Sequence, residues 1–230
     1  MSEPINNPKS SRKLTADMFF EKFNSPGLMI MPQPVLSLFS QGKTTGVVLE
    51  SGDGVTQVAP IYEGYSLPNT VERVDLGGCD ITAHLRLLLK RSGYNFNTPS
   101  ELEILKSMKE VIVSCKNSTV LEDDLKKKDE ESPKVCYLPD GTPLTVTSEG
   151  VRAAEILFNP KIVNNESVAG GGVQHLVVNC IKRADMDLRD SLYKNIVLTG
   201  GNTLISKFLE RLQRELQGIV KSSKTTVGDR

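Results

Sequence analysis

Runs of apolar residues in the first half of the chain are separated by turn residues, a pattern that is typical of an antiparallel sheet. Two runs rich in β-branched side chains, 45–49 and 55–62, flank the turn SGDG at 51–54 and predict a β-hairpin. A third run, 70–76, predicts a further strand. We therefore expect a sheet whose first turn is rich in glycine and carries an acidic side chain.

Two helices are predicted after this sheet. Asp80 is expected to cap the first helix, which ends at Gly93. Ser100 and Glu103 have the spacing of a capping box and predict the start of the second helix, which runs to about Cys115. The apolar faces of these two helices are formed by Ile81, Leu85, Leu88, Leu89, Leu102, Leu105, Met108 and Ile112.

In the N-terminal region the sequence predicts only short helices and a short strand. The spacing of apolar residues in 14–23 indicates an amphipathic helix that stops before Pro26. A strand is expected over 28–31, and a short helix over 35–42.

The second half of the chain contains a charged segment, a hairpin signal and two glycine turns. Both charge signs are dense in 121–134, which we expect to be a solvated connector. Asp140-Gly141 lies between two short apolar runs and predicts a second hairpin. Three glycines at 170–172 precede a helical pattern over 173–181. The last unit is a strand over 196–198, the turn TGGN at 199–202, and a helix that starts near 204.

Composition and charge restrict the class of protein. Hydrophobic residues make up 38% of the chain, enough for a buried core, and 28 basic residues balance 28 acidic ones. This balance argues against direct binding of nucleic acid or a membrane surface. The four cysteines lie far apart in the sequence, which argues against a metal site. We expect a globular protein of the cytoplasm or the nucleus without a membrane span.

The two glycine turns are the candidate ligand-binding site of this sequence. A glycine turn before a helix lets a phosphate approach the backbone and the unpaired N–H groups of the helix N-terminus. Taken alone, Gly200-Gly201 is more often only a tight turn. The acidic hairpin at 51–54 favours a phosphate site, because two glycine turns that face each other would enclose a phosphate chain. In such a site Asp53 would hold a ribose or a hydrated metal ion.

Several stretches resemble actin and the actin-related proteins, in the same order and at nearly the same spacing. They are VLSLFSQGKTTGVVLESGDGVTQVAPIYEGYSLP, RVDLGGCDIT, YLPDG and YKNIVLTGGNTL. DMDLR and RLLLKRSGYNF look closest to centractin, the subfamily of the dynactin filament.

The resemblance implies the α/β fold of the actin-like ATPases, which is ribonuclease H-like. It assigns 1–44 to part of actin subdomain 1, 45–76 and 166–230 to a subdomain 3-like unit, and 77–165 to a subdomain 4-like unit. A short insertion at 169–171 is expected near the plug loop of the family.

The resemblance also implies ATP or ADP with Mg²⁺ as ligand. It maps the second phosphate loop, a glycine near the ribose, three charged residues of one helix, and the third nucleotide loop onto this chain. The cofactor-binding positions so implied are Gly52, Asp53, Gly54, Val55, Gly78, Lys106, Lys109, Glu110, Gly200, Gly201 and Asn202.

Two positions match the family's catalytic residues, with departures. Gln33 matches the glutamine that orients the attacking water, although an amide at the edge of the core is the plain alternative. Glu50 stands where the family has an aspartate that helps to order metal-bound water, and Gln57 replaces the histidine that assists it. Lys106 replaces an arginine.

Further departures concern the base and the ends of the chain. Asn202, Leu204 and Ile205 replace threonine, methionine and tyrosine near the base. Complete actins continue beyond both ends of the matching region, and the first phosphate loop belongs to the preceding part. We therefore expect no ATP turnover and no tight binding by this polypeptide alone, whether it is a natural short subunit or a piece of a longer chain.

Three function classes remain open. The first is a structural, cytoskeletal actin-related protein, a subunit of a filament of actin-like subunits or of a larger complex, with a degenerate nucleotide site. The second is an ATPase of ordinary actin type, which requires the further segments. The third is a subunit of a chromatin-remodelling complex, but no basic localisation run supports it, because Lys126-Lys127-Lys128 is flanked by acidic residues.

Overall fold

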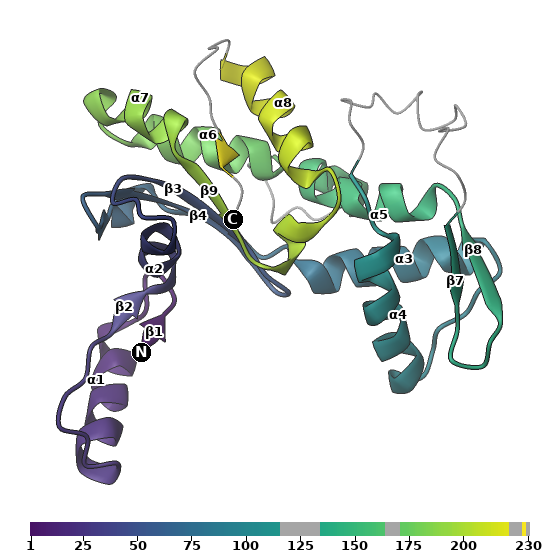
Figure 1. Ribbon diagram of the computed structural model, residues 1–230, viewed down its shortest axis with the longest axis horizontal. Coiled ribbons are helices and arrows are strands. Elements are labelled where there is room, and N and C mark those ends of the chain that lie inside the picture. The colour runs from purple at the N-terminus through teal and green to yellow at the C-terminus, as the bar shows by residue number, and fades with distance from the viewer. Residues whose placement is uncertain (116–133, 164–170, 221–226, 229–230) are drawn as a thin grey trace.

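The structure is a computed structural model that describes residues 1–115, 134–163, 171–220 and 227–228. It contains a twisted mixed sheet, a helical region at one end of the sheet, and an N-terminal arm that projects from the other end (Figure 1). No helix in these ranges has the length and apolar character needed to cross a bilayer. The charged connector 121–134 lies outside the described residues except for Lys134, as do Ala169 and Gly170 of the expected insertion.

The main sheet has the strand order β10-β9-β3-β4-β5, with β6 also paired to β4. The β3–β4 hairpin is antiparallel, whereas β9 runs parallel to β3 and β10 runs parallel to β9. The hairpin predicted from the SGDG turn is therefore confirmed. The strands are β3 (Gly46–Ser51), β4 (Thr56–Tyr62), β5 (Tyr65–Ser66), β6 (Glu72–Val74), β9 (Ile196–Thr199) and β10 (Val227–Gly228).

Helices cover both faces of this sheet. α6 (Val173–Arg183) and α7 (Met186–Lys194) lie on one face, and α2 (Gln33–Ser40) lies on the other (Figure 1). Because side chains alternate along a strand, Val47 and Leu49 of β3 join the large hydrophobic core, whereas Val48 joins a smaller cluster with Val35 and Leu38 of α2. The core thus extends over both sides of β3.

The helical region contains α3 (Gly78–Arg91), α4 (Pro99–Ile112) and α5 (Glu149–Phe158). Beside them lies the predicted second hairpin, formed by β7 (Lys134–Tyr137) and β8 (Pro143–Val146). After the 3₁₀ turn Pro160–Val163 the chain returns to the sheet, and α8 (Phe208–Val220) packs against α6.

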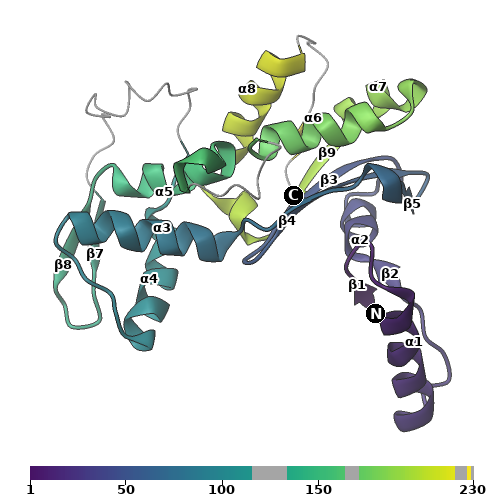
Figure 2. The same ribbon diagram turned by 180° about the vertical axis from the view of Figure 1, so that it is seen from behind.

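The N-terminal arm carries exposed apolar side chains. It consists of β1 (Ser2–Glu3), α1 (Lys9–Asp17), a π-helical turn over Met18–Lys22, and β2 (Met31–Pro32), and it leads into α2. Figure 1 and Figure 2 both show it pointing away from the sheet. Helical structure covers residues 9–22, so the helix predicted over 14–23 is confirmed and begins earlier than expected. The strand expected over 28–31 is reduced to the short β1–β2 pairing.

The predicted starts of three helices are wrong. Gly77 caps α3, and Asp80 lies one turn inside, where its carboxylate accepts the Gly77 N–H. Thr98 caps α4 and forms the capping box with Glu101, because Pro99 restricts Thr98 to extended backbone and favours the first helical position for itself. The residues 201–204 form a 3₁₀ turn, so that α8 begins at Phe208 and not near 204.

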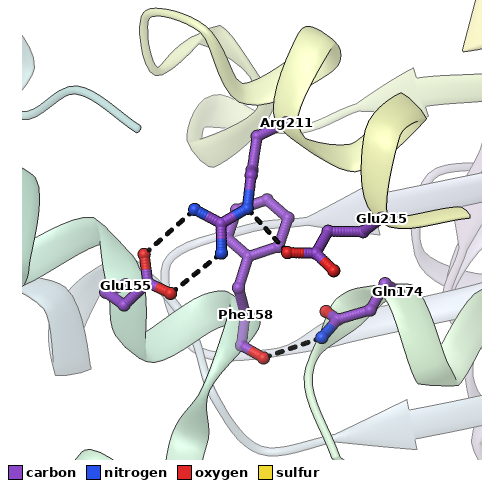
Figure 3. Close-up of polar contacts among 5 residues, drawn as sticks. All are labelled: Glu155, Phe158, Gln174, Arg211 and Glu215. Atoms are coloured by element: carbon purple, nitrogen blue, oxygen red, sulfur yellow. Dashed lines mark hydrogen bonds and ion pairs between the residues drawn. The ribbon is translucent and has the colours of Figure 1, made fainter. Parts of the chain in front are cut away.

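A buried charged cluster joins α8 to α5 (Figure 3). Arg211 of α8 donates to both carboxylate oxygens of Glu155 at 3.0 and 3.3 Å, and its Nε donates to Glu215 at 2.8 Å. The guanidinium also lies over the ring of Phe158, 4.9 Å from its centroid. The Gln174 amide of α6 donates to the carbonyl of Phe158, so that three helices meet at this cluster.

Candidate nucleotide-binding site

A cavity of about 670 Å³ lies at the edge of the main sheet where β3 and β9 end. These two strands are parallel, so the turns that follow them come from the same edge. α4 forms a further wall. The cavity is lined by Gly52, Asp53, Lys106, Lys109, Glu110, Gly201, Asn202, Leu204 and Ile205.

The second glycine turn lies directly against the end of β3. Gly200 has φ +94°, and a Cβ there would lie 2.2 Å from the carbonyl oxygen of Ser51. Only glycine allows this close approach together with a left-handed backbone. Gly201 is different, because no atom of the described residues, apart from its chain neighbours, lies within 4 Å of the place that its Cβ would take. The backbone at Gly201 is therefore open to a ligand.

Asn202 joins the two turns. Its amide nitrogen donates to Ser51 Oγ at 3.1 Å and to the carbonyl of Gly52 at 2.7 Å. Below this contact, the hydroxyls of Ser51 and Thr56 lie 2.8 Å apart, and Thr56 donates to the carbonyl of Leu76. Sequence reasoning missed Ser51 and Thr56 as supports of the site, although their position as the last pair of the hairpin was the available signal.

The start of α3 is bound to the first turn. The Gly78 N–H donates to the Gly52 carbonyl at 3.0 Å, and the Cys79 N–H donates to the Asp53 carbonyl at 2.9 Å. The Lys109 ammonium donates to the Gly78 carbonyl at 3.0 Å. These N–H groups of α3 therefore hold the turn in place, and the open backbone at Gly201 is the better place for a phosphate.

The charges of the cavity come mainly from α4. Lys106, Lys109 and Glu110 are spaced three and four residues apart and so lie on one side of the helix. Lys106 lies 3.7 Å from Glu103, and both of these side chains are substantially exposed. Asp53 adds a carboxylate from the first turn. Two ammonium groups thus border a cavity whose opposite side is glycine backbone.

A smaller pocket of about 270 Å³ adjoins the cavity and shares Asp53 and Lys106 with it. Cys79 and Arg86 of α3 line this pocket. Burial, followed by the Asp80 and Asp53 carboxylates, raises the pKa of the Cys79 thiol. This cysteine is therefore protonated at neutral pH and a weak nucleophile.

Most of the predicted binding residues meet in this cavity. Gly52, Asp53, Lys106, Lys109, Glu110, Gly201 and Asn202 line it, and Gly54, Val55, Gly78 and Gly200 belong to the segments that carry them.

The two predicted catalytic residues are not among the residues that line the cavity. Gln33 is the first residue of α2. Glu50 pairs across the hairpin with Gln57, whose amide donates to its carboxylate at 2.7 Å.

The donors and the size of this cavity suit a phosphate-bearing ligand. Ligand cavities in proteins have volumes of about 300–1,000 Å³, and the ammonium groups and open glycine backbone are the partners that phosphates prefer. The described residues contain no group of three or more His, Cys, Asp or Glu side chains placed to hold a metal ion. The carboxylates that line the cavity are those of Asp53 and Glu110, and these are the side chains that would be available to a metal ion bound with phosphates.

Comparison with known proteins defines the family. The actin family model matches residues 1–228. An actin-like protein of Neurospora crassa is 43% identical over 220 residues, which cover 94% of this chain and 57% of that relative. The chain belongs to the actin family, and its mixed α/β architecture is that of the actin-like ATPase fold. It spans 57% of the length of the relative.

Proposed function

We propose that this protein is a structural actin-related protein of the cytoplasmic cytoskeleton, with a nucleotide site that hydrolyses ATP slowly or not at all. In this proposal it acts as a centractin-like subunit of a filament of actin-like subunits or of a larger multiprotein complex. Membership of the actin family supports the general class. The arrangement of the cavity supports a bound ATP or ADP with Mg²⁺.

The Glu50–Gln57 pair is the observation that supports low hydrolysis. Hydrolysis requires charged groups that hold the attacking water in place, and their loss lowers the rate by orders of magnitude. Glu50 uses one carboxylate oxygen on the Gln57 amide, and neither residue is among those lining the cavity. The ammonium groups of Lys106 and Lys109 do line it. The cavity lining therefore contains ammonium groups that can bind a nucleotide but not the Glu50–Gln57 pair that would order the attacking water.

Calorimetric titration with magnesium ATP, combined with a phosphate-release assay, tests this proposal. We expect binding weaker than micromolar and no phosphate release above the background. Lys109→Met should lower the affinity about tenfold, because it removes one of the two ammonium groups that line the cavity, together with its hydrogen bond to the Gly78 carbonyl. Lys90→Met is the matched control, since Lys90 is exposed at the far end of α3 and does not line the cavity.

Three outcomes would count against the proposal. Turnover at a rate typical of an ATPase would favour the enzyme alternative. An unchanged affinity in Lys109→Met would place the nucleotide elsewhere. A folded chain that binds no nucleotide would remove the ligand from the proposal and leave the structural role, which sedimentation with candidate actin-like subunits tests.

A further inference from the structure

We propose that Thr15 of the N-terminal arm is a phosphorylation site for a protein kinase that selects arginine three residues before its target, and that the Glu3–Arg12 ion pair limits this reaction. The proposal rests on the sequence around Thr15, on the exposure of the arm, and on the contacts that hold Arg12. It is independent of the nucleotide cavity.

Thr15 lies in a sequence that such kinases recognise. Arg12 and Lys13 precede it by three and two residues, in the order Arg-Lys-Leu-Thr. Kinases of this class bind their substrates through acidic side chains that pair with basic residues before the target hydroxyl. No other serine or threonine of the 230-residue sequence has an arginine three residues before it. The charge pattern therefore distinguishes Thr15 from every other hydroxyl side chain of this type in the chain.

The position of the arm gives a kinase access to this segment. α1 and the π-helical turn that follows it contain no buried residue, and Thr15 is partly exposed. The arm points away from the sheet in both ribbon views (Figure 1 and Figure 2). Kinases bind the residues around the target in an extended conformation, so α1 must open locally. A short helix without buried contacts opens at a low cost in free energy, and the hydrophobic core stays intact.

Arg12 already has a partner in the folded arm. Its Nε donates to Glu3 Oε2 at 3.1 Å and its Nη2 donates to Glu3 Oε1, while the side-chain amide of Asn7 donates to Glu3 at 3.0 Å. The hydrogen bonds from Arg12 lower the pKa of Glu3, although burial opposes them, so the carboxylate is charged at neutral pH. The Arg12 side chain is 52% exposed and can be reached from solvent. The kinase and Glu3 therefore compete for one guanidinium.

The reaction uses magnesium ATP that is bound by the kinase. The γ-phosphorus forms a bond to Thr15 Oγ1 while its bond to the β,γ-bridging oxygen breaks, so that ADP leaves and the hydroxyl proton passes to a base of the kinase. The product gains a charge of about −1.5 to −2 at pH 7, one helical turn after Arg12.

Incubation of the whole chain with magnesium ATP and the catalytic subunit of the cyclic AMP-dependent protein kinase tests the site. We expect a single phosphate per chain, which fragmentation mass spectrometry should place on Thr15, and Thr15→Ala should abolish its incorporation. Ser10→Ala and Ser11→Ala are the matched controls, since both serines are exposed on the same helix without an arginine three residues before them. Phosphate on another residue, or none on the folded wild-type chain, would overturn the proposal.

A set of variants around the ion pair tests the competition for Arg12. Glu3→Gln should raise kcat/KM of the kinase for the chain about threefold, because a neutral amide holds the guanidinium less strongly than a carboxylate. Glu21→Gln should leave it unchanged, since it removes the same charge from an exposed residue of the π-helical turn. Equal rates for the wild type and Glu3→Gln would overturn the proposed competition.

A further variant separates this competition from a general loosening of the arm. Asn7→Ala removes the other hydrogen bond to Glu3 and leaves the Arg12 pair in place. We expect its kcat/KM to stay at the wild-type value. A rise as large as that of Glu3→Gln would assign the effect to opening of the arm and overturn the role of the ion pair.

Discussion

The Arg211 cluster and the charged wall of the cavity use similar residues in opposite ways. Arg211 is 3% exposed and is bound by two carboxylates and an aromatic ring (Figure 3). Lys106, on the wall of the cavity, is 49% exposed and has only a loose contact with Glu103. A charged side chain that is buried and paired within the protein contributes to stability. A charged side chain that is exposed to solvent is available to a ligand.

The pKa of Arg211 reflects this complete pairing. Burial would lower the pKa of the guanidinium, but the Glu155 carboxylate and the hydrogen bond to Glu215 raise it above its ordinary value. The guanidinium therefore stays charged at neutral pH. Substitutions in the two regions should accordingly separate stability from binding.

The largest effect is expected at Arg211. Arg211→Met removes the buried guanidinium that Glu155 and Glu215 bind and should lower the free energy of unfolding by about 3–5 kcal/mol. Urea denaturation measures it. The control is Arg73→Met, which removes an exposed ion pair with Asp75 and should cost less than about 1 kcal/mol. Equal costs for the two variants would show that burial does not distinguish them.

The two adjacent glycines of the second turn provide the next test. Gly200→Ala places a Cβ against Ser51 in a left-handed backbone and should cost about 1–3 kcal/mol of stability. Gly201→Ala has open space around it and should change stability by less than about 0.5 kcal/mol. Thermal unfolding of both variants compares them. A larger loss for Gly201→Ala would contradict the close packing of the turn on β3.

Local sequence patterns predicted the sheet better than the helices. β-Branched runs around a glycine turn identified β3 and β4, because a hairpin is a local structure. α5 was missed although its apolar residues are buried, because the charged Glu155 lies within its short apolar run and is buried with it. α7 was missed for a different reason, since only Leu192 is buried in it. The cap of α3 is a glycine, which has no capping side chain to recognise.

Local sequence patterns also failed to predict the polar contacts between distant parts of the chain. The glycine turns of the cavity were predicted from local sequence and family resemblance. The contact of Asn202 with Ser51 joins residues 151 positions apart, and that of Arg211 with Glu155 joins residues 56 apart. In the sequence, Arg211 and Glu155 look like surface charges of amphipathic helices. Only the packing of α8 on the helical region brings them together.

A smaller effect is expected at His84, a half-buried residue of α3. Burial, followed by the charges of Arg152 and Arg91, lowers the pKa of His84 in the folded protein. The unfolded chain therefore binds more protons as the pH falls below about 6.5, so the free energy of unfolding decreases over this interval. Urea denaturation between pH 7.5 and 5.5 should show a shallower decrease for His84→Gln. His175→Gln at an exposed position is the control, and identical slopes for wild type and His84→Gln would contradict the prediction.

The smallest effect on stability is expected at Glu103. Its contact with Lys106 is long and exposed, so Glu103→Gln should change the free energy of unfolding by less than about 0.5 kcal/mol. The same change frees Lys106 for an anionic ligand and removes a nearby negative charge, so the affinity for magnesium ATP should rise about twofold at low salt. Titrations at two salt concentrations measure this, because screening should reduce the gain. A weakened affinity would mean that Glu103 holds Lys106 in its binding position, and this exposed pair would then serve the cavity as Glu155 serves Arg211.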